Sequence, residues 1–142
     1  MDLNRGSITA LTVSGLSKEY PGVRALSNVS FTVDPGIVLA VVGENGAGKS
    51  TLMKSIAGAE RATAGQIEVF GTSLVAGNPR AASDAGVAMI YQELTIVPEL
   101  TAQENVYLGR LPTLFGVVRA KQLRRNYRAV AQRVGSGIRP EA

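Results

Sequence analysis

The sequence contains no cysteine and no histidine. Without cysteine the chain has no disulfides, no thiolate nucleophiles and no cysteine ligands for zinc or iron–sulfur clusters, which fits a reducing compartment. Without histidine it lacks the side chain that most often acts as a general base near neutral pH. Any hydrolytic chemistry must therefore use carboxylates, lysine, backbone dipoles or a metal held by oxygen ligands.

Long hydrophobic runs are also scarce. The longest uninterrupted apolar run, residues 37–42, is far shorter than the roughly 20 residues that a helix needs to cross a bilayer. The first residues lack the charged-then-apolar pattern of an export signal. With 142 residues, of which 45% are hydrophobic, the chain has the length and the apolar content of one folded domain.

Three short apolar segments predict strands, at residues 29–33, 37–42 and 87–91. The second and third are apolar almost throughout, which is typical of strands that helices cover on both faces. We therefore expect an α/β fold in which a sheet is buried under flanking helices.

Helices are predicted between and after these strands. Apolar residues recur every three or four positions from Gly48 to Gly58, where a helix is expected to end. Asn78 and Pro79 combine an N-cap residue with a proline in the first turn, which predicts a short helix up to about residue 85.

Two further helix signals lie in the last third of the chain. Thr101 and Glu104 have the spacing of a capping box, which opens a segment through residue 108. A last helix is predicted over residues 120–134. Its apolar residues lie on one face: Leu123, Tyr127, Val130 and Val134.

This last helix is strongly basic. Residues 119–133 contain six of the 15 lysines and arginines, so the positive charge is local rather than spread over the surface. No aromatic platform is interleaved with them, as a binder of single-stranded nucleic acid would need. We expect a solvated helix face and no nucleic acid partner.

The segment VVGENGAGKST, residues 41–51, interrupts an apolar run with three glycines and a lysine. Gly43, Gly48, Lys49 and Ser50 match the pattern G-x-x-x-x-G-K-[ST] and lie between a predicted strand and a predicted helix, the context in which this pattern forms a phosphate-binding loop. A plain glycine turn leaves the spacing unexplained, and a Rossmann loop has a different glycine spacing.

The residue types of this P-loop suit a phosphate site. Small residues let backbone N–H groups turn inward, and the N-terminus of the following helix adds unpaired donors and a partial positive charge. In such a loop Lys49 reaches the β- and γ-phosphates, Ser50 ligates Mg²⁺, and Thr51 adds a hydroxyl to the α-phosphate. The predicted binding residues are Gly43, Glu44, Asn45, Gly46, Ala47, Gly48, Lys49, Ser50 and Thr51.

Beyond the loop, the sequence resembles the ATP-binding subunits of ABC transporters. The segment LSKEYPGVRAL, residues 16–26, is similar to the family's segment with an aromatic residue that stacks on adenine, and Tyr20 is at that position. The segment VAMIYQE, residues 87–93, is similar to the strand that leads into the Q-loop, with Gln92 as the glutamine that senses Mg²⁺ and the attacking water. Residues 94–110, LTIVPELTAQENVYLGR, resemble the importers of ribose, xylose and galactoside type.

The resemblance implies an ATP-binding and ATP-hydrolysing subunit that energises carbohydrate import. Its cofactors would be ATP and Mg²⁺, with Lys49 and Gln92 in catalysis and Ser50 and Gln92 at the metal. Its partners would be the transmembrane permease subunits and a second nucleotide-binding domain, the two domains sandwiching ATP. Its place would be the cytoplasmic face of the bacterial inner membrane, as a peripheral protein.

The resemblance also implies a P-loop NTPase core with a mixed sheet and flanking helices. Residues 1–92 would form the N-terminal part of the ATP-binding core, and residues 93–142 the Q-loop and the start of the helical subdomain. The Walker B aspartate, the LSGGQ-like signature and the switch histidine are absent, since the only aspartate after Lys49 is Asp84, which no apolar strand precedes. We expect the chain to be the first part of a longer protein that binds nucleotide weakly and does not hydrolyse ATP alone.

Other interpretations stay open from the residues themselves. A small P-loop kinase or GTPase would need an acceptor-binding lid or an Asn-Lys-x-Asp run, and neither appears. A non-catalytic module that binds nucleotide as a structural or regulatory ligand needs only the P-loop. Without the resemblance, Tyr20 is an aromatic residue beside a Pro-Gly turn, and Gln92 is a polar residue at a strand end.

Overall fold

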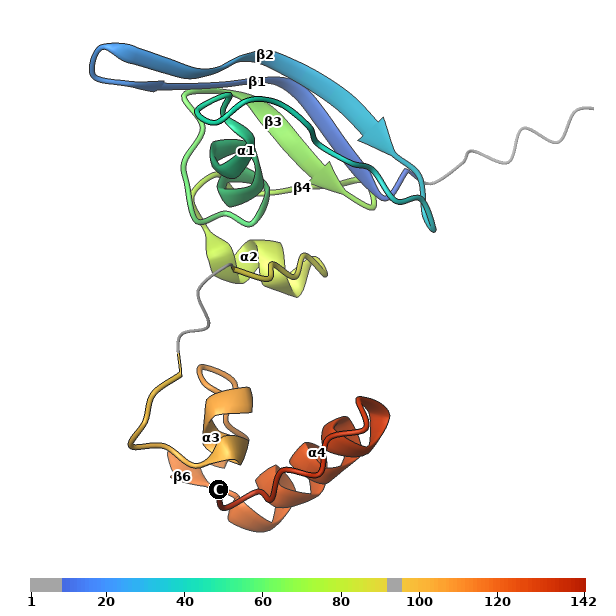
Figure 1. Cartoon of the computed structure of the whole chain (residues 1–142), viewed down its shortest axis with the longest axis vertical. Helices are drawn as coiled ribbons and strands as arrows, with labels where there is room; N and C mark the ends of the chain where they lie inside the picture. Colours follow the sequence, from blue (N-terminus) through green and yellow to red (C-terminus); the bar gives the residue numbers. More distant parts are fainter. Residues whose placement is uncertain (1–8, 92–95) are drawn as a thin grey trace, which may run out of the picture. The chain divides into compact units, whose positions relative to one another are not determined.

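The computed structural model describes residues 9–91 and 96–142 (Figure 1). They form two compact units, which divide between Ile90 and Tyr91. Across the described ranges, no helix is both long enough and apolar enough to cross a membrane.

The first unit is built on an antiparallel sheet. Strands β1 (Leu11–Tyr20) and β2 (Val23–Val33) form a long hairpin. Strand β3 (Ala64–Val69) pairs with the other edge of β1, and β4 (Thr72–Ser73) pairs with β3, which gives the order β2-β1-β3-β4. The predicted strand at residues 29–33 is confirmed as the second half of β2.

Helix α1 (Lys49–Ile56) supplies the core of this unit by packing on the sheet (Figure 1). Its buried side chains Leu52 and Ile56 are four residues apart and therefore lie on one face of the helix. The helix was predicted at this position. The buried cluster consists of Val13, Leu16, Leu26, Leu52, Ile56 and Ile67.

Helix α2 (Pro79–Asp84) confirms the second helix prediction. The Asn78 side-chain oxygen accepts a hydrogen bond from the Ala81 N–H at 3.0 Å, so this residue caps the helix as its type predicts. The end of α1 lies against this cap. Gly58 has a φ of +72°, and a Cβ added there would lie 2.6 Å from the Asn78 carbonyl oxygen, so only glycine fits.

The two apolar segments predicted as buried strands do not form strands. Residues 37–42 and 87–91 join no ladder among the described residues. Val38 is 97% exposed, Val42 86% and Ile90 92%. An extended segment becomes a stable strand only when a neighbour takes its backbone hydrogen bonds, and the described part of the chain supplies none for these two.

The second unit contains α3 (Ala102–Val106), the short strands β5 (Thr113–Leu114) and β6 (Val117–Val118), and α4 (Ala120–Arg133). Helix α3 ends two residues earlier than predicted and α4 one residue earlier. The buried residues of α4 are Leu123, Tyr127 and Ala131. Val130 and Val134, predicted on the same face, are 37% and 72% exposed, so the buried face is narrower than predicted.

The start of α3 is held by a carboxylate. Glu104 Oε2 accepts hydrogen bonds from the Thr101 N–H at 2.9 Å and from the Thr101 hydroxyl. These two bonds, the hydroxyl first, hold the pKa of Glu104 below its ordinary value of 4.5. The capping role predicted for this pair is confirmed. The next residue, Asn105, ties the preceding loop down through the N–H and carbonyl of Val97.

The lowered pKa of Glu104 gives a pH-dependent contribution to stability. A depressed folded-state pKa stabilises the fold above the unfolded-state pKa, and this stabilisation is lost as the pH falls through the folded-state pKa. Replacing Glu104→Gln should therefore lower the unfolding midpoint of the second unit at neutral pH, and the difference from the unchanged chain should close as the pH falls below 4.5. Glu99→Gln, which removes an exposed carboxylate of the same unit, is the matched control. A Glu104→Gln effect that stays constant into acid would contradict this account.

Candidate phosphate-binding site

The N-terminus of α1 opens directly onto the P-loop. Gly48 is its N-cap, no side chain caps it, and no acidic residue lies in its first turn. Leu52 is the first residue whose N–H bonds back, to the Gly48 carbonyl at 2.9 Å. Among the described residues, no acceptor takes the N–H groups of Lys49, Ser50 and Thr51. Three donors and the positive end of the helix dipole are therefore directed at the loop.

Gly48 holds the loop against the hairpin. Its φ is +88°, and an added Cβ would overlap the carbonyl oxygen of Ala25 and approach Leu26 Cδ2 at 3.0 Å. Only glycine permits both this backbone conformation and this close approach. Gly46 has a similar φ of +86°, but an added Cβ there would meet nothing within 4 Å. The two glycines therefore differ in what they do: Gly46 turns the loop, and Gly48 also seats it on β2.

Lys49 bends back across the loop that precedes it. Its ammonium nitrogen donates to the carbonyl oxygens of Gly43 and Glu44, both at 2.6 Å. A turn bond from the Ala47 N–H to the Glu44 carbonyl, at 3.2 Å, closes the same loop. No ion pair found in the described part of the chain includes Lys49, so neutral carbonyls hold its positive charge and no carboxylate neutralises it.

The other predicted residues fall into three groups. Ser50 is exposed and Thr51 half-buried in the first turn of α1, and Glu44 and Asn45 are exposed in the loop. Tyr20 ends β1 and is 39% exposed, on the same hairpin as the Ala25 that abuts Gly48. Gln92 lies outside the described residues.

Lys18 is a contact of Tyr20 that the sequence pattern does not single out. Its ammonium lies 4.8 Å from the centroid of the Tyr20 ring, a cation–π distance, and 2.6 Å from a carboxylate oxygen of Glu60. The hydrogen bond from Lys18 is the main cause of a lowered pKa at Glu60. Residues two apart on a strand lie on the same face, so the spacing of Lys18 and Tyr20 in the sequence could have predicted their contact.

The residues present fit a phosphate group better than a metal on its own. Across the described ranges, no group of three or more acidic residues could hold a cation. Asp84 is exposed at the last position of α2 rather than at the end of a strand. The Ser50 hydroxyl offers one oxygen ligand, and Mg²⁺ usually takes its remaining ligands from phosphates and water. Backbone N–H groups without acceptors, together with an ammonium that no carboxylate neutralises, suit a phosphate group.

The loop and its helix have the sequence pattern and the local geometry of a P-loop. Residues 26–139 match the model of the ABC transporter family. The chain therefore belongs to this family, as the resemblance of its motifs predicted.

The relatives are sugar importers by name. The arabinose import ATP-binding protein AraG of Rhizobium johnstonii is 48% identical over 132 residues, which is 93% of this chain and 26% of that protein. A protein of Agrobacterium fabrum, named for ribose, galactose and methyl galactoside import, is 46% identical over 94% of this chain and 27% of its own length. The chain thus spans about a quarter of the length of these curated relatives.

Solved structures confirm the predicted fold class. A nucleotide-free ATP-binding cassette from an ABC transporter matches with a TM-score of 0.65 and 27% identity, over 81% of this chain and 45% of that one. The dimeric cassette MJ0796, bound to ADP and Pi, matches with a TM-score of 0.67 over 86% of this chain and 56% of that one; at 20% identity it supports the fold alone. The described residues are therefore part of an ABC-type P-loop fold.

Gly48 and Gly46 offer a direct test of how the loop is held. Replacing Gly46→Ala should cost about 1 kcal/mol of unfolding free energy in the first unit, from the positive φ alone. Replacing Gly48→Ala should cost at least twice as much, because the new Cβ also meets the Ala25 carbonyl. Urea unfolding of the two variants measures both. Equal losses would show that Gly48 is not seated on β2.

Proposed function

We propose that the chain binds ATP through residues 43–51 and is part of a subunit that energises carbohydrate import. The observation that carries the proposal is that, among the described residues, one loop brings together the Lys49 ammonium, which no carboxylate neutralises, and the helix N–H groups that have no acceptor. Family membership supports the nucleotide as the ligand. The names of relatives that are 46% and 48% identical support sugar import as the process.

Lys49 is the residue whose contacts change when ATP binds. It exchanges two neutral carbonyl acceptors, at 2.6 Å each, for anionic oxygens of the β- and γ-phosphates. Charge-assisted hydrogen bonds are roughly twice as strong as neutral ones, so the exchange favours binding. The N–H groups at the start of α1 bind the same phosphates, and Thr51 adds a hydroxyl to the α-phosphate.

The remaining site residues have roles at the edges of the nucleotide. Tyr20 stacks on the adenine ring from the end of β1, with Lys18 fixing the ring from its own strand. Mg²⁺, when bound, neutralises phosphate charge, with Ser50 and Gln92 beside it. The role of Gln92 stays a prediction from sequence.

The proposed partners follow from the relatives. They are transmembrane permease subunits of a sugar importer and a second nucleotide-binding domain that closes over ATP, with the chain peripheral to the cytoplasmic face of the membrane. Residues 1–92 act as the ATP-binding part, and residues 93–142 as the start of the part that transmits closure to the permease. A non-catalytic nucleotide-binding module is the alternative, and the sugar-importer relatives favour the transporter.

ATP hydrolysis by a P-loop protein also needs an acidic residue beyond the loop, usually an aspartate at the end of a strand, which helps to hold Mg²⁺. The only aspartate after Lys49 is Asp84, exposed at the end of α2. The proposal for this chain is therefore nucleotide binding, and the expectation that it does not turn over ATP alone stays a prediction.

Replacing Lys49→Ala tests the proposed phosphate contact. ATP affinity should fall at least tenfold, because a charge-assisted bond to phosphate contributes about 1.5–3 kcal/mol. Lys54→Ala is the matched control: it removes an exposed lysine from the last turn of the same helix and should leave the affinity unchanged. Displacement of a fluorescent ATP analogue measures both.

The unfolding curves of the two lysine variants serve as the control for folding. If they coincide with that of the unchanged chain while ATP affinity is equal in all three proteins, Lys49 does not contact phosphate and the proposed function fails.

A further inference from the structure

The proposed function does not use the basic residues around α4. Residues 119–133 carry six basic and no acidic side chains, whereas the rest of the chain carries nine basic and eleven acidic ones. The net charge of +4 therefore comes entirely from this segment. Such a concentration of one sign has to be matched by an anionic partner or remain in solvent.

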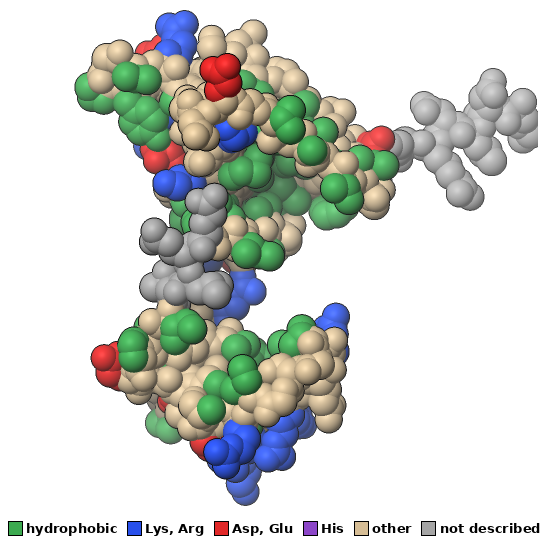
Figure 2. Space-filling model, viewed as in Figure 1, with side chains coloured by type: hydrophobic (Ala, Val, Ile, Leu, Met, Phe, Trp, Pro, Cys, Tyr) green, Lys and Arg blue, Asp and Glu red, His purple; other side chains and the backbone are tan. Residues whose placement is uncertain are grey.

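The basic face of α4 consists of Lys121, Arg124, Arg125 and Arg128, all exposed. Their spacing of three, four and seven residues places them on one side of the helix. Together with Ala129 and Gln132 they line a shallow depression of about 400 Å³. Figure 2 shows blue side chains gathered along this edge of the unit.

Little within the second unit neutralises this face. Glu141 forms an ion pair with Arg124, at 2.8 Å, and this is the only ion pair of the basic face among the described residues. From Lys121 to Arg128 the helix rises about 10 Å, which is about one Debye length near physiological salt. The four cations therefore act on a partner as a single charged surface.

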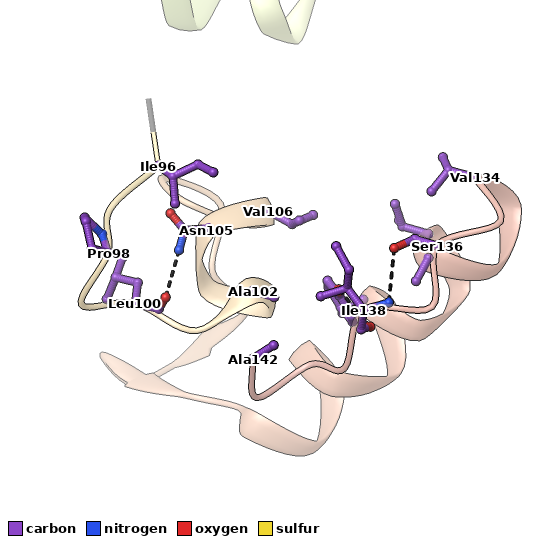
Figure 3. A pocket seen from close by; sticks show the side chains of 13 residues that line it. Ile96, Pro98, Leu100, Ala102, Asn105, Val106, Val134, Ser136, Ile138 and Ala142 are labelled. Atoms are coloured by element: carbon purple, nitrogen blue, oxygen red, sulfur yellow. Dashed lines mark hydrogen bonds between the residues drawn. The ribbon is translucent and has the colours of Figure 1, made fainter. Parts of the chain in front are cut away.

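The opposite side of α4 packs against other residues of the second unit. Leu123, Tyr127 and Ala131 are buried, and the Tyr127 hydroxyl donates to the Ile138 carbonyl at 3.1 Å. Beyond them, α3 and α4 line an apolar cavity of about 580 Å³ (Figure 3). The helix is therefore anchored through its apolar side, and its basic face points to solvent as a fixed surface.

The side chains of the basic face indicate which class of anionic partner it suits. Tyr127 is the aromatic residue of α4 and is only 5% exposed, so the face offers nothing on which a base could stack. A row of solvated cations along a shallow depression fits a plane of anionic headgroups. Long-range attraction to such a plane needs no dehydration of the arginines, which agrees with their exposure.

We propose that the basic face of α4 docks on the anionic headgroups of a membrane surface. The choice of a membrane over another polyanion rests on the proposed function, which places the chain beside a bilayer. The contact holds the second unit close to the surface through charge alone, and it weakens as salt rises.

Cosedimentation of the full chain with vesicles tests this proposal. The chain should bind vesicles of phosphatidylcholine with added phosphatidylglycerol, and not vesicles of phosphatidylcholine alone. Replacing Lys121→Gln, Arg125→Gln and Arg128→Gln together should lower the partition coefficient at least tenfold, because each basic residue near an anionic bilayer contributes about fivefold. Arg124 is left in place to keep its ion pair with Glu141.

The matched control removes three exposed charges from the first unit: Lys54→Gln, Arg61→Gln and Arg80→Gln. It has the same net charge as the α4 variant and should bind anionic vesicles as the unchanged chain does.

Equal losses in the two triple variants, or equal binding to neutral vesicles, would overturn the proposal. Tighter binding to duplex DNA at the same salt, abolished by the α4 replacements, would also overturn it. Both variants retain Lys49, so ATP affinity measured in parallel separates failure here from failure of the proposed function.

Discussion

An uncapped helix N-terminus, seated on a hairpin by a single glycine, is the constraint on which the site depends. Gly48 can lie against the Ala25 carbonyl only because it has no Cβ and adopts a φ of +88°. This contact fixes where α1 begins, and with it the direction of the N–H groups of Lys49, Ser50 and Thr51. The burial of Leu52 and Ile56 then holds the whole helix on the sheet. One short helix therefore both packs in the core and opens the proposed phosphate site.

The loop is held mainly from its C-terminal side. The segment that enters it, residues 37–42, joins no strand among the described residues and exposes Val38 and Val42. The segment that leaves it is the packed helix α1. The bonds from Lys49 to the Gly43 and Glu44 carbonyls close the loop internally. The geometry of the proposed phosphate site therefore comes from glycine conformations, one lysine and one helix, and not from a paired strand.

Local chemistry made part of this structure predictable from sequence. The P-loop, the Asn78 cap and the Thr101–Glu104 pair each involve residues a few positions apart, so residue type and spacing were sufficient. Strand pairing depends on distant partners. The unbroken apolar runs at residues 37–42 and 87–91 indicated that these segments tend to be buried. They did not indicate which strands would pair with them. Strand β1 was missed because LTVSGLSKEY mixes polar and apolar residues, and one of its two partner strands, β3, lies about 50 residues further along the chain. The contact of Lys18 with Tyr20 was missed because neither residue belongs to the P-loop pattern.

The central claim is that the backbone amides of residues 46–51 receive phosphate. Amide chemical shifts of the full chain, followed by nuclear magnetic resonance during titration with ATP, test it most directly. The account predicts that the largest saturable changes fall on Gly46, Gly48, Lys49, Ser50 and Thr51, because their N–H groups gain charged acceptors. Saturable changes centred elsewhere, with these amides unmoved, would contradict it.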